Sequence, residues 1–514
     1  MEGFGVASGS HGKLVSRRFR AMKTGPQRYY SPLLAFLLTA CVVRFWLFLL
    51  PESFWLDETV TAFIIRHGTS HPSLAAGPRL DQTIYYWLPR VSQAIFGFSE
   101  LSLRLPSLVV TLCSLFLISR LAARFIHPAA GWFAVFVCFI PREFTRQATD
   151  ARPYGLGTFV ALAAIWFLVR WLDEGSWRDA ALFAVFAALQ VRVHLIYWPF
   201  YAVFAGYAAL RWVRRETAAS TRSLAAVFAI VAASLVPMIA PTLGLLREAK
   251  SHIVVQPPTR TDIVSGFQIP LVLAAGIVLW AVGRLFRWSP NHRAVSISGT
   301  LLIVSWWLWE PACLLAVSWI TGNSIFVPRY FSTALPGLAL VCTFAAGYSV
   351  PAREWKPVAI ALGAGILIVG LWKEPFPPSR NSHWREAALT VNDLTRTSAM
   401  SVICPSPFVE GVSPAWSPAY PLPGFLYSHL DAYPLRTAPI LFPARREPEG
   451  DRYARSLIAN GFLRDRRFAI YGGWYGVSLW TDWFAAQPEL AGWQNEQVGR
   501  FGDAEIVLFF TRRQ

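Results

Sequence analysis

Apolar runs long enough to cross a lipid bilayer recur along the chain from residue 31 to residue 373. A helix needs about 20 apolar residues to cover the roughly 30 Å of hydrocarbon in a bilayer. The composition agrees, because 54% of the 514 residues are hydrophobic and only 15% are charged, against roughly 25% in soluble domains. We therefore predict a polytopic α-helical membrane protein with about eleven spans. The predicted spans are 31–50, 105–125, 128–141, 155–172, 179–193, 195–213, 223–246, 267–286, 296–320, 332–350 and 357–373.

The basic residues set the expected orientation. The net charge of +17 is spread over short segments between the apolar runs, which is typical of membrane topology and argues against nucleic acid as a partner. Residues 1–30 form a basic tail that we expect in the cytoplasm. Cys41 lies within an apolar run that continues past it, so we predict an uncleaved first span. An odd number of spans then places residues 374–514 outside.

Residues 374–514 are expected to form a small extracytoplasmic α+β domain. A helical pattern at 384–396 is followed by β-like runs such as RFAIYGG and AEIVLFF. Only Cys404 of the six cysteines lies in this tail, so no internal disulfide can support it. The sequence contains no CxxC or HExxH motif, and we interpret His67 and His71 as loop histidines rather than metal ligands.

The first outside loop, residues 51–104, contains the most informative short stretch. PESFWLDETV places Asp57 and Glu58 directly after the first span, and 57–67 is predicted as a short helix with an apolar face. Asp57 stands where a helix N-cap would stand, so capping is one interpretation. The other is a carboxylate that acts as general base toward an acceptor hydroxyl. Residues 82–98 are predicted to form an amphipathic helix along the membrane surface.

Two later outside loops add arginines and tyrosines to the same face. The second loop contains RQATDARPYGL and the fifth contains SIFVPRYFSTALPGL. Guanidinium groups hold phosphate through two parallel hydrogen bonds, so this face suits chemistry on an anionic lipid headgroup. Each arginine taken alone is also a common loop or interface residue. The residues that share the face of Asp57 are Asp150, Arg152, Tyr154, Arg329 and Tyr330.

Four other residues leave two interpretations open. Glu310 lies within a predicted span, where an acid marks a functional site or pairs with a buried base such as Arg44. His194 lies at an outside boundary and either lines the site or anchors the interface. In the tail, Trp474 and Trp480 either stack on sugar rings or pack in the core.

The ordered set of motifs resembles one family. LDE in the first outside loop is followed by LRLPS at 103–107, DARPYGL at 150–156, PRYFSTALPGLAL at 328–340 and HWREAALTV at the start of the tail. Together they are similar to the polyprenyl-phosphate-sugar-dependent membrane glycosyltransferases of the C superfamily, in the branch of protein O-mannosyltransferases and aminoarabinose transferases. The resemblance covers nearly the whole chain. It implies a glycosyltransferase-C-like fold and transfer of a glycosyl residue from a polyprenyl-phosphate sugar to an extracytoplasmic hydroxyl, with inversion at the anomeric carbon.

The resemblance also implies roles for the matching residues. Asp57 matches the family's catalytic base and Glu58 its acidic neighbour. Arg152 and Tyr154 match an E-x-R-x-Y pattern, and Arg329 precedes the tyrosine of a pair expected near the lipid phosphate. The expected ligands of the donor phosphate are Arg152, Arg329, Tyr330 and Arg79. The expected residues of the substrate cavity are Asp81, Tyr85, Asp150, Tyr154 and His194.

Two departures from the family pattern bear on the substrate and on the partners. LDQTIYY at 80–86 replaces His-Pro-Pro-Leu-Tyr-Tyr, so Asp81 and Gln82 stand where family residues face the acceptor, and Asp150 replaces a glutamate. No cofactor is certain, and a divalent metal cation stays open because family members differ. The expected partners are a polyprenyl-phosphate-linked sugar, the lipid bilayer of a bacterial inner membrane, and a glycan, lipid or protein acceptor.

Alternatives to glycosyl transfer from a lipid phosphate remain. A transporter or flippase of lipid-linked sugar predicts ionisable residues near mid-membrane and an internal repeat, whereas the ionisable clusters here lie at one face. A glycan polymerase or ligase would use diphosphate-linked glycans. A non-catalytic scaffold would use the tail for binding.

Overall fold

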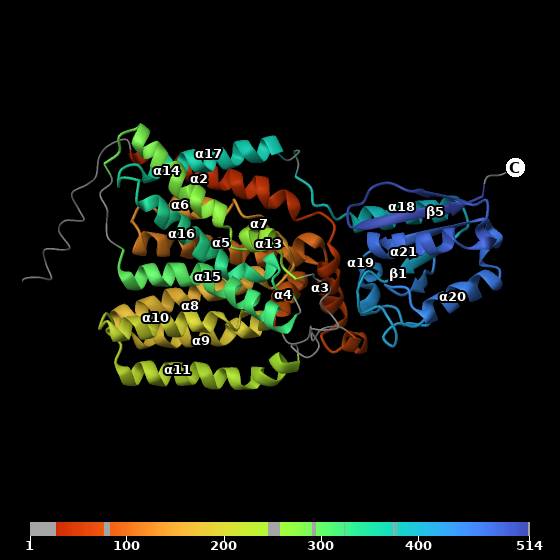
Figure 1. Ribbon diagram of the computed structural model, residues 1–514, viewed down its shortest axis with the longest axis horizontal. Coiled ribbons are helices and arrows are strands. Elements are labelled where there is room, and N and C mark those ends of the chain that lie inside the picture. Colours follow the sequence, from red (N-terminus) through yellow and green to blue (C-terminus); the bar gives the residue numbers. More distant parts are fainter. Residues whose placement is uncertain are drawn as a thin grey trace, which may run out of the picture.

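A computed structural model describes residues 27–76, 83–244, 257–289, 295–322, 324–373, 376 and 378–511. Its long helices lie roughly parallel in one bundle, and a sheet domain formed by the C-terminal residues lies beyond one end of that bundle (Figure 1). The helix α3 (Leu56–His67) lies between the two. The expected class, a polytopic helical protein with a small C-terminal α+β domain, is confirmed.

Each of the eleven predicted spans contains a helix within the described residues. These helices are α2 (Gln27–Phe45), α5 (Glu100–Phe125), α6 (Gly131–Val137), α8 (Tyr154–Glu174), α9 (Trp177–Val193), α10 (Phe200–Val213), α11 (Thr221–Leu235), α14 (Ile269–Leu285), α15 (Ile297–Thr321), α16 (Leu335–Gly347) and α17 (Trp355–Lys373). Over the described ranges, seven helices are long and apolar enough to cross a bilayer, or eight if α13 (Arg260–Gly266) and α14, bent by 56°, form one span. The helices α6, α9 and α10 are shorter, so the number of about eleven spans stays a prediction.

Short helices connect the spans and form the first outside loop. The predicted amphipathic helix at 82–98 is two pieces, η5 (Ile84–Tyr86) and α4 (Trp87–Phe96). The other connecting helices are η2 (Leu47–Leu49), η3 (Pro72–Ala76), α7 (Arg142–Thr149), η6 (Leu195–Tyr197), η7 (Val236–Met238) and η8 (Pro328–Ala334). The last of them, η8, leads directly into α16 and carries two of the predicted site residues.

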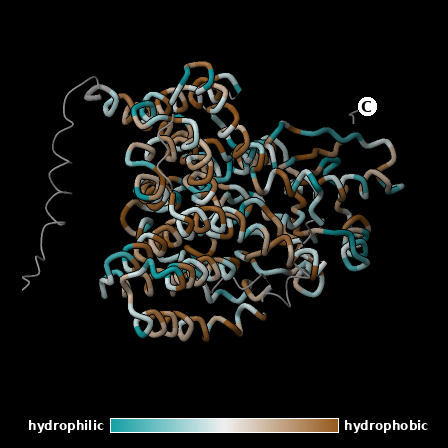
Figure 2. The backbone as a smooth tube through the Cα atoms, turned by 60° about the vertical axis from the view of Figure 1, so that its left-hand side comes forward, coloured by the Kyte–Doolittle hydropathy of each residue, from teal (hydrophilic) through white to brown (hydrophobic). Residues whose placement is uncertain are grey.

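The bundle has a packed centre and an apolar outer surface. The helices α8 and α16 are mostly buried, whereas α11 and α17 lie at opposite edges (Figure 1). Large apolar side chains such as Phe36, Phe116 and Trp372 are more than half exposed, which suits lipid rather than water. Figure 2 shows hydrophobic residues along the whole bundle and more hydrophilic ones in the C-terminal domain.

One glycine fixes the approach of α16 to α15. A Cβ atom on Gly337 would lie 2.6 Å from the backbone nitrogen of Trp307. Because backbone atoms cannot move aside as a flexible side chain can, only glycine permits this contact. Trp306 adds a hydrogen bond from its indole Nε1 to the carbonyl oxygen of Thr333, at 2.7 Å. The helix that follows η8 is therefore held firmly against α15.

The C-terminal domain is a five-stranded mixed sheet with helices. Its strands have the order β2-β1-β3-β5-β4, in which β2, β1 and β3 are parallel and β5 and β4 are antiparallel to their neighbours. The strands are β1 (Ser401–Pro405), β2 (Ile440–Phe442), β3 (Arg467–Gly473), β4 (Gln494–Gln497) and β5 (Ala504–Phe510). The helices are α18 (Trp384–Thr397), η9 (Phe425–Tyr427), α19 (Ser428–Ala432), α20 (Pro448–Ala459), η10 (Phe462–Asp465), α21 (Trp474–Ala485) and η11 (Pro488–Leu490).

This domain folds around its own aromatic core, as expected for a tail without a disulfide. RFAIYGG and AEIVLFF are the strands β3 and β5. Trp480 is fully buried against Phe442, so packing is its role. Trp474 is 60% exposed and is not part of the core.

Candidate active site

The helix α3 places the two acids of the first loop in different environments. The helix begins at Leu56, and its N-cap residue is Trp55. Glu58 Oε2 accepts a hydrogen bond from the backbone N–H of Trp55 at 3.2 Å. The capping interpretation is therefore wrong for Asp57, because the carboxylate of Glu58 satisfies the orphan amide at this helix end. The side chain of Asp57 is left for another role.

Glu58 forms a buried ion pair with Arg104 of α5. Arg104 Nε donates to Glu58 Oε1 at 2.8 Å, and its Nη2 donates to Oε2. Both side chains are completely buried. Burial would raise the pKa of Glu58, but the charge and hydrogen bonds of Arg104, with the charge of Arg380 and the Ala151 amide, hold it below its ordinary value. Glu58 is therefore a permanent anion that ties α3 to α5.

The same carboxylate also reaches the second outside loop. The backbone N–H of Ala151 donates to Glu58 Oε1 at 2.6 Å. Arg104 additionally donates to the carbonyl oxygens of Glu52 at 2.6 Å and Ser53 at 3.0 Å. One buried pair thus fixes the chain on both sides of Asp57 and next to Arg152.

Asp57 lies between the two predicted phosphate-binding arginines. Its Oδ2 is 3.3 Å from Arg329 Nη1 and 3.8 Å from Arg152 Nη2. Arg152 Nη1 also donates to the backbone carbonyl of Asp57 at 3.1 Å. A quarter of the Asp57 side chain remains exposed. Three residues from distant parts of the sequence therefore converge on one small, accessible site.

Arg152 is a stable cation in this place. Burial would lower the pKa of its guanidinium group, but the Asp57 carboxylate raises it well above its ordinary value. Because arginine stays protonated in proteins in any case, the site carries two positive charges and one negative charge. An anionic ligand can take the place of the Asp57 carboxylate on the guanidinium groups.

Aromatic rings border this cluster. Tyr154 stacks on His194 with ring centroids 5.9 Å apart, and Tyr330 lies 6.4 Å from Tyr154 and 5.9 Å from His194. Burial, with the charges of Arg152 and Arg329, lowers the pKa of His194 to about 3. The backbone N–H of Ile196 donates to Nδ1 of the ring at 3.2 Å. His194 is therefore neutral at ordinary pH, with its proton assigned to Nε2.

Tyr85 is a buried residue at the start of η5. It is buried, and its hydroxyl is 3.4 Å from the hydroxyl of Ser107. Burial raises the pKa of the phenol far above its ordinary value, so it stays protonated. Arg79 and Asp81, the other predicted residues of this loop, lie outside the described residues.

Asp150 forms an ion pair with a residue of the C-terminal segment. Its Oδ1 is 2.9 Å from Arg380 Nη1. Burial raises the pKa of Asp150 from its ordinary value of 3.8 to about 6, although Arg380 partly opposes this. Asp150 is therefore a buried carboxylate whose charge depends on pH near neutrality.

This shift predicts a pH-dependent stability difference between the wild-type protein and Asp150→Asn. The folded state binds the proton of Asp150 more tightly than the unfolded state, so ionisation between about pH 4 and about pH 6 lowers the free energy of unfolding. We expect the wild type to lose stability relative to the variant as pH rises through this range. Thermal unfolding of both proteins in detergent at several pH values measures the difference. A constant difference would show that Asp150 titrates normally.

Two arginines of the site were not predicted from the sequence. Arg104 lies in the LRLPS motif, one turn into α5, but the predicted span begins at residue 105, so the sequence placed Arg104 in the preceding loop and gave no sign of its burial. Arg380 lies in the segment between α17 and α18. Nothing in its local sequence distinguishes it from an ordinary linker arginine.

Glu310 is separate from this cluster. It is fully buried and accepts a hydrogen bond from Thr333 Oγ1. The guanidinium of Arg44 donates instead to the carbonyl oxygen of Gly370 at 3.3 Å, so the predicted pairing of Glu310 with Arg44 is wrong. Thr333 belongs to η8, four residues after Arg329. Glu310 thus anchors the segment that carries a site arginine.

The described residues do not offer a metal site. Within the described ranges, no group of three His, Cys, Asp or Glu side chains is placed to hold a metal ion. Around Asp57 the neighbouring polar groups are guanidiniums, which repel a cation. This donor set does not fit a divalent metal.

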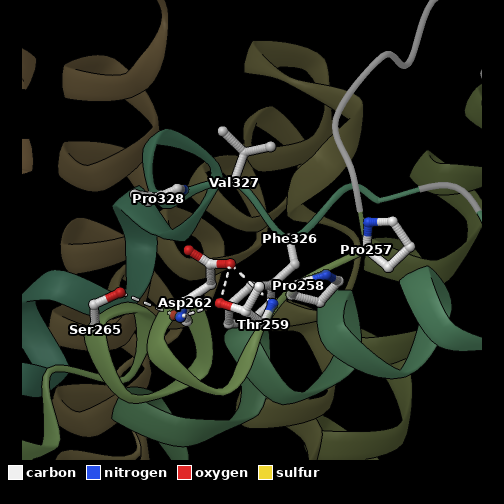
Figure 3. Close-up of a pocket in the computed structure, with 8 residues that line it drawn as sticks. All are labelled: Pro257, Pro258, Thr259, Asp262, Ser265, Phe326, Val327 and Pro328. Atoms are coloured by element: carbon white, nitrogen blue, oxygen red, sulfur yellow. Dashed lines mark hydrogen bonds between the residues drawn. The ribbon is translucent and has the colours of Figure 1, made fainter.

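A pocket of about 240 Å³ lies against the segment that precedes Arg329 (Figure 3). It is formed by the start of α13 and by residues 326–328. Asp262 is the charged residue of its lining, and its Oδ2 accepts hydrogen bonds from the backbone N–H and the hydroxyl of Thr259. This carboxylate caps α13, and none of the predicted site residues lines the pocket.

Comparisons with known proteins confirm the expected resemblance. Residues 82–239 match the family model described as dolichyl-phosphate-mannose-protein mannosyltransferase. The fold matches that of ArnT from Cupriavidus metallidurans in the apo state, with a TM-score of 0.54 and 10% identity, over 93% of this chain and 98% of that chain. ArnT of the same organism bound to undecaprenyl phosphate gives a TM-score of 0.52, with the same identity and coverage. A search of the curated proteins found no match.

The chain is therefore an integral membrane protein with the glycosyltransferase-C fold. Within that class it is similar to a mannosyltransferase family over residues 82–239 and, in fold, to ArnT over nearly its whole length.

Proposed function

We propose that the protein transfers a glycosyl residue from a polyprenyl-phosphate sugar to an acceptor hydroxyl of a glycan, lipid or protein outside the cytoplasm. The observation that carries this proposal is the convergence of Asp57, Arg152 and Arg329 at the end of the bundle nearest the C-terminal domain. The carboxylate provides a proton acceptor and the two guanidinium groups provide a binding site for an anion. All three are close enough to contact one sugar-phosphate headgroup. The likeness to a mannosyltransferase family model supports this chemistry.

The donor phosphate is bound by Arg152 and Arg329 in the proposed reaction. The bond between the anomeric carbon and the phosphate oxygen breaks, and its electron pair stays on the phosphate, which leaves with one more negative charge. Fixed cations stabilise this developing charge, and losing one comparable donor costs roughly 3–4 kcal/mol. No general acid is required, because the lipid phosphate is already a competent leaving group.

The acceptor oxygen attacks the anomeric carbon from the opposite side, which inverts its configuration. Its proton passes to the carboxylate of Asp57, which is partly exposed and is freed when the donor phosphate engages the arginines. Glu58 does not contact the substrate, because it is fully buried and both of its oxygens are occupied. We assign it the role of positioning Asp57.

The rings of Tyr154, His194 and Tyr330 are proposed to contact the sugar. They lie beside the two arginines, and flat apolar faces suit the C–H groups of a pyranose or furanose ring. The neutral Nε2–H of His194 is available as a hydrogen-bond donor to a sugar or phosphate oxygen.

The proposed location follows from the predicted topology. If the basic N-terminal tail is cytoplasmic, the C-terminal domain and the site lie on the extracytoplasmic face of a bacterial inner membrane. The position of the ionisable cluster at one end of the bundle also favours an enzyme over a transporter, which would place its binding residues near the midplane. A glycan polymerase or ligase would differ from the proposed enzyme in its donor, because it would use diphosphate-linked glycans.

The direct test is incubation of the purified protein with a panel of prenyl-phosphate sugars and candidate acceptors. Mass spectrometry follows loss of the headgroup and release of prenyl phosphate. We expect consumption of at least one prenyl-phosphate sugar. Consumption of diphosphate-linked glycans alone would instead establish the polymerase or ligase.

Arg329→Gln is expected to weaken donor binding and transfer together. Loss of one preorganised cation should reduce kcat/KM by about 10²- to 10³-fold. The control is Arg146→Gln, because Arg146 lies on α7 near the same end, is exposed, and pairs only weakly with Glu143 at 3.4 Å. The measurements are initial transfer rates and binding of prenyl phosphate. Equal behaviour of the two variants would remove Arg329 from the phosphate site.

A further inference from the structure

Arg380 connects three segments around the proposed site. It belongs to the stretch between the last span and α18, and its side chain is 12% exposed. Its Nη1 lies 2.9 Å from Asp150 Oδ1 and 3.5 Å from Glu58 Oε2, and its Nη2 donates to the carbonyl oxygen of Thr149. Its backbone N–H donates to Glu52 Oε2 at 2.5 Å. A residue from the C-terminal segment therefore binds both the first and the second outside loop.

The bound residues flank the chemical groups. Glu52 and Glu58 lie on either side of Asp57 in the first loop, and Asp150 lies two residues before Arg152 in the second. Neither Asp57 nor Arg152 touches Arg380 directly in any described contact. Arg380 thus acts on both of them through their neighbours in the chain.

We propose that Arg380 is a positioning residue of the transfer reaction, through which the C-terminal segment holds Asp57 and Arg152 at their working separation. This inference rests on the proposed function. It extends that function, because it makes a segment beyond the last span part of the catalytic unit. Removing the contact changes the distance between the base and one phosphate-binding cation without deleting either group.

The chemistry of the contacts requires an arginine. The guanidinium group is planar and presents five donors in a fixed fork, so it can bind two carboxylates and a carbonyl oxygen at once. A lysine at this position presents one compact ammonium group, which can keep the ion pair with Asp150 but not the full set. We therefore expect Arg380→Lys to recover only part of the function.

The two carboxylates depend on Arg380 to different degrees. Glu58 keeps the buried pair with Arg104 when Arg380 is removed. Asp150 has Arg380 as its one ion-pair partner among the residues that the structure describes. Loss of Arg380 therefore leaves the buried carboxylate of Asp150 without its ion-pair partner, two residues before Arg152 in the chain. Either the second loop moves or Asp150 takes up a proton.

Arg385 provides a matched control in the same segment. Its Nη1 pairs with Glu100 at 3.2 Å, and its Nη2 donates to the carbonyl oxygen of Pro51 at 3.0 Å. It also joins the C-terminal domain to the bundle, but it contacts neither Glu58 nor the second outside loop in the described structure. Arg385→Gln therefore weakens the junction between the domains without touching the proposed positioning contact.

The experiment compares Arg380→Gln, Arg380→Lys, Arg385→Gln and the wild type in the full-length protein. For each we measure kcat and KM for the donor, thermal unfolding in detergent, and binding of prenyl phosphate alone. Arg329 comes from a segment that Arg380 does not contact, so binding of prenyl phosphate should fall less in Arg380→Gln than in Arg329→Gln. We expect kcat to fall about 10- to 100-fold, the range for misplaced catalytic groups, with partial recovery in Arg380→Lys. Arg385→Gln should keep the wild-type kcat.

Two results would contradict the positioning role of Arg380, and a third would contradict the proposed function. Equal losses of kcat in Arg380→Gln and Arg385→Gln, at equal shifts in Tm, would reduce Arg380 to a docking contact and overturn the inference. Wild-type kcat in Arg380→Gln would also overturn it. No transfer by the wild-type protein from any prenyl-phosphate sugar would overturn the proposed function itself, and the positioning role would be lost with it.

Discussion

Asp57→Asn is expected to lose glycosyl transfer while it retains the donor lipid. Loss of a general base lowers rates by roughly 10²- to 10⁴-fold, and asparagine cannot accept the acceptor's proton. Asparagine also removes the anion that occupies Arg152 and Arg329 in the absence of substrate. We therefore expect Asp57→Asn to bind prenyl phosphate as tightly as the wild type or a few-fold more tightly. The measurements are initial transfer rates and equilibrium binding of prenyl phosphate.

The control for this variant is Asp431→Asn. Asp431 also pairs with an arginine, Arg66, and lies where the C-terminal domain meets α3, but it is not among the site residues. It should keep the wild-type rate. Transfer by Asp57→Asn at the wild-type rate would refute the base assignment, and weaker binding of prenyl phosphate would show that Asp57 holds the donor rather than competing with it.

Glu58→Gln is expected to have the largest effect on stability. The variant leaves the Arg104 guanidinium completely buried without its counter-ion, and breaking a buried pair from one side costs roughly 3–5 kcal/mol. The Tm in detergent should therefore fall strongly in Glu58→Gln, whereas it should change little in Asp57→Asn. Activity should fall as well, because α3, which carries Asp57, loses its buried ion pair with Arg104 of α5.

Two further variants test whether the loss of stability in Glu58→Gln comes from the buried pair with Arg104. Glu143→Gln breaks the exposed pair with Arg146 and should change stability by less than about 1 kcal/mol. The double variant Glu58→Gln with Arg104→Met should be less destabilised than the sum of the single variants, because residues that share one contact are not additive. Additive effects, or a Glu58→Gln protein as stable as the wild type, would contradict the buried pair.

The sequence predicted the elements that depend on local chemistry. Apolar runs located a helix in each predicted span, and β-propensity located β3 and β5 at the expected residues. The shared face of Asp57, Arg152 and Arg329 could also be predicted, because basic loops fix which ends of the spans lie together. Their contacts with one another depend on tertiary structure. The sequence predicted only that the three residues lie on the same side of the membrane.

The errors of prediction concern partners that are distant in the chain. The N-cap of α3 is Trp55 rather than Asp57, and Glu58 makes the capping contact, a shift of two residues in the helix start signal that local propensity does not determine. Glu310 bonds Thr333 rather than Arg44 because η8 folds back against α15. Arg380 gave no local signal at all, since its carboxylate partners lie more than 200 positions away along the chain.

The resting pairing of Asp57 with its two arginines has a consequence for selectivity against soluble anions. With Asp57 between Arg152 and Arg329, the site holds one net positive charge rather than two, so free phosphate or sulfate must compete with an internal carboxylate. A lipid carrier confined to the bilayer reaches the same cations at a much higher effective concentration. We expect the enzyme to be almost insensitive to millimolar inorganic phosphate while it responds to far smaller amounts of prenyl phosphate.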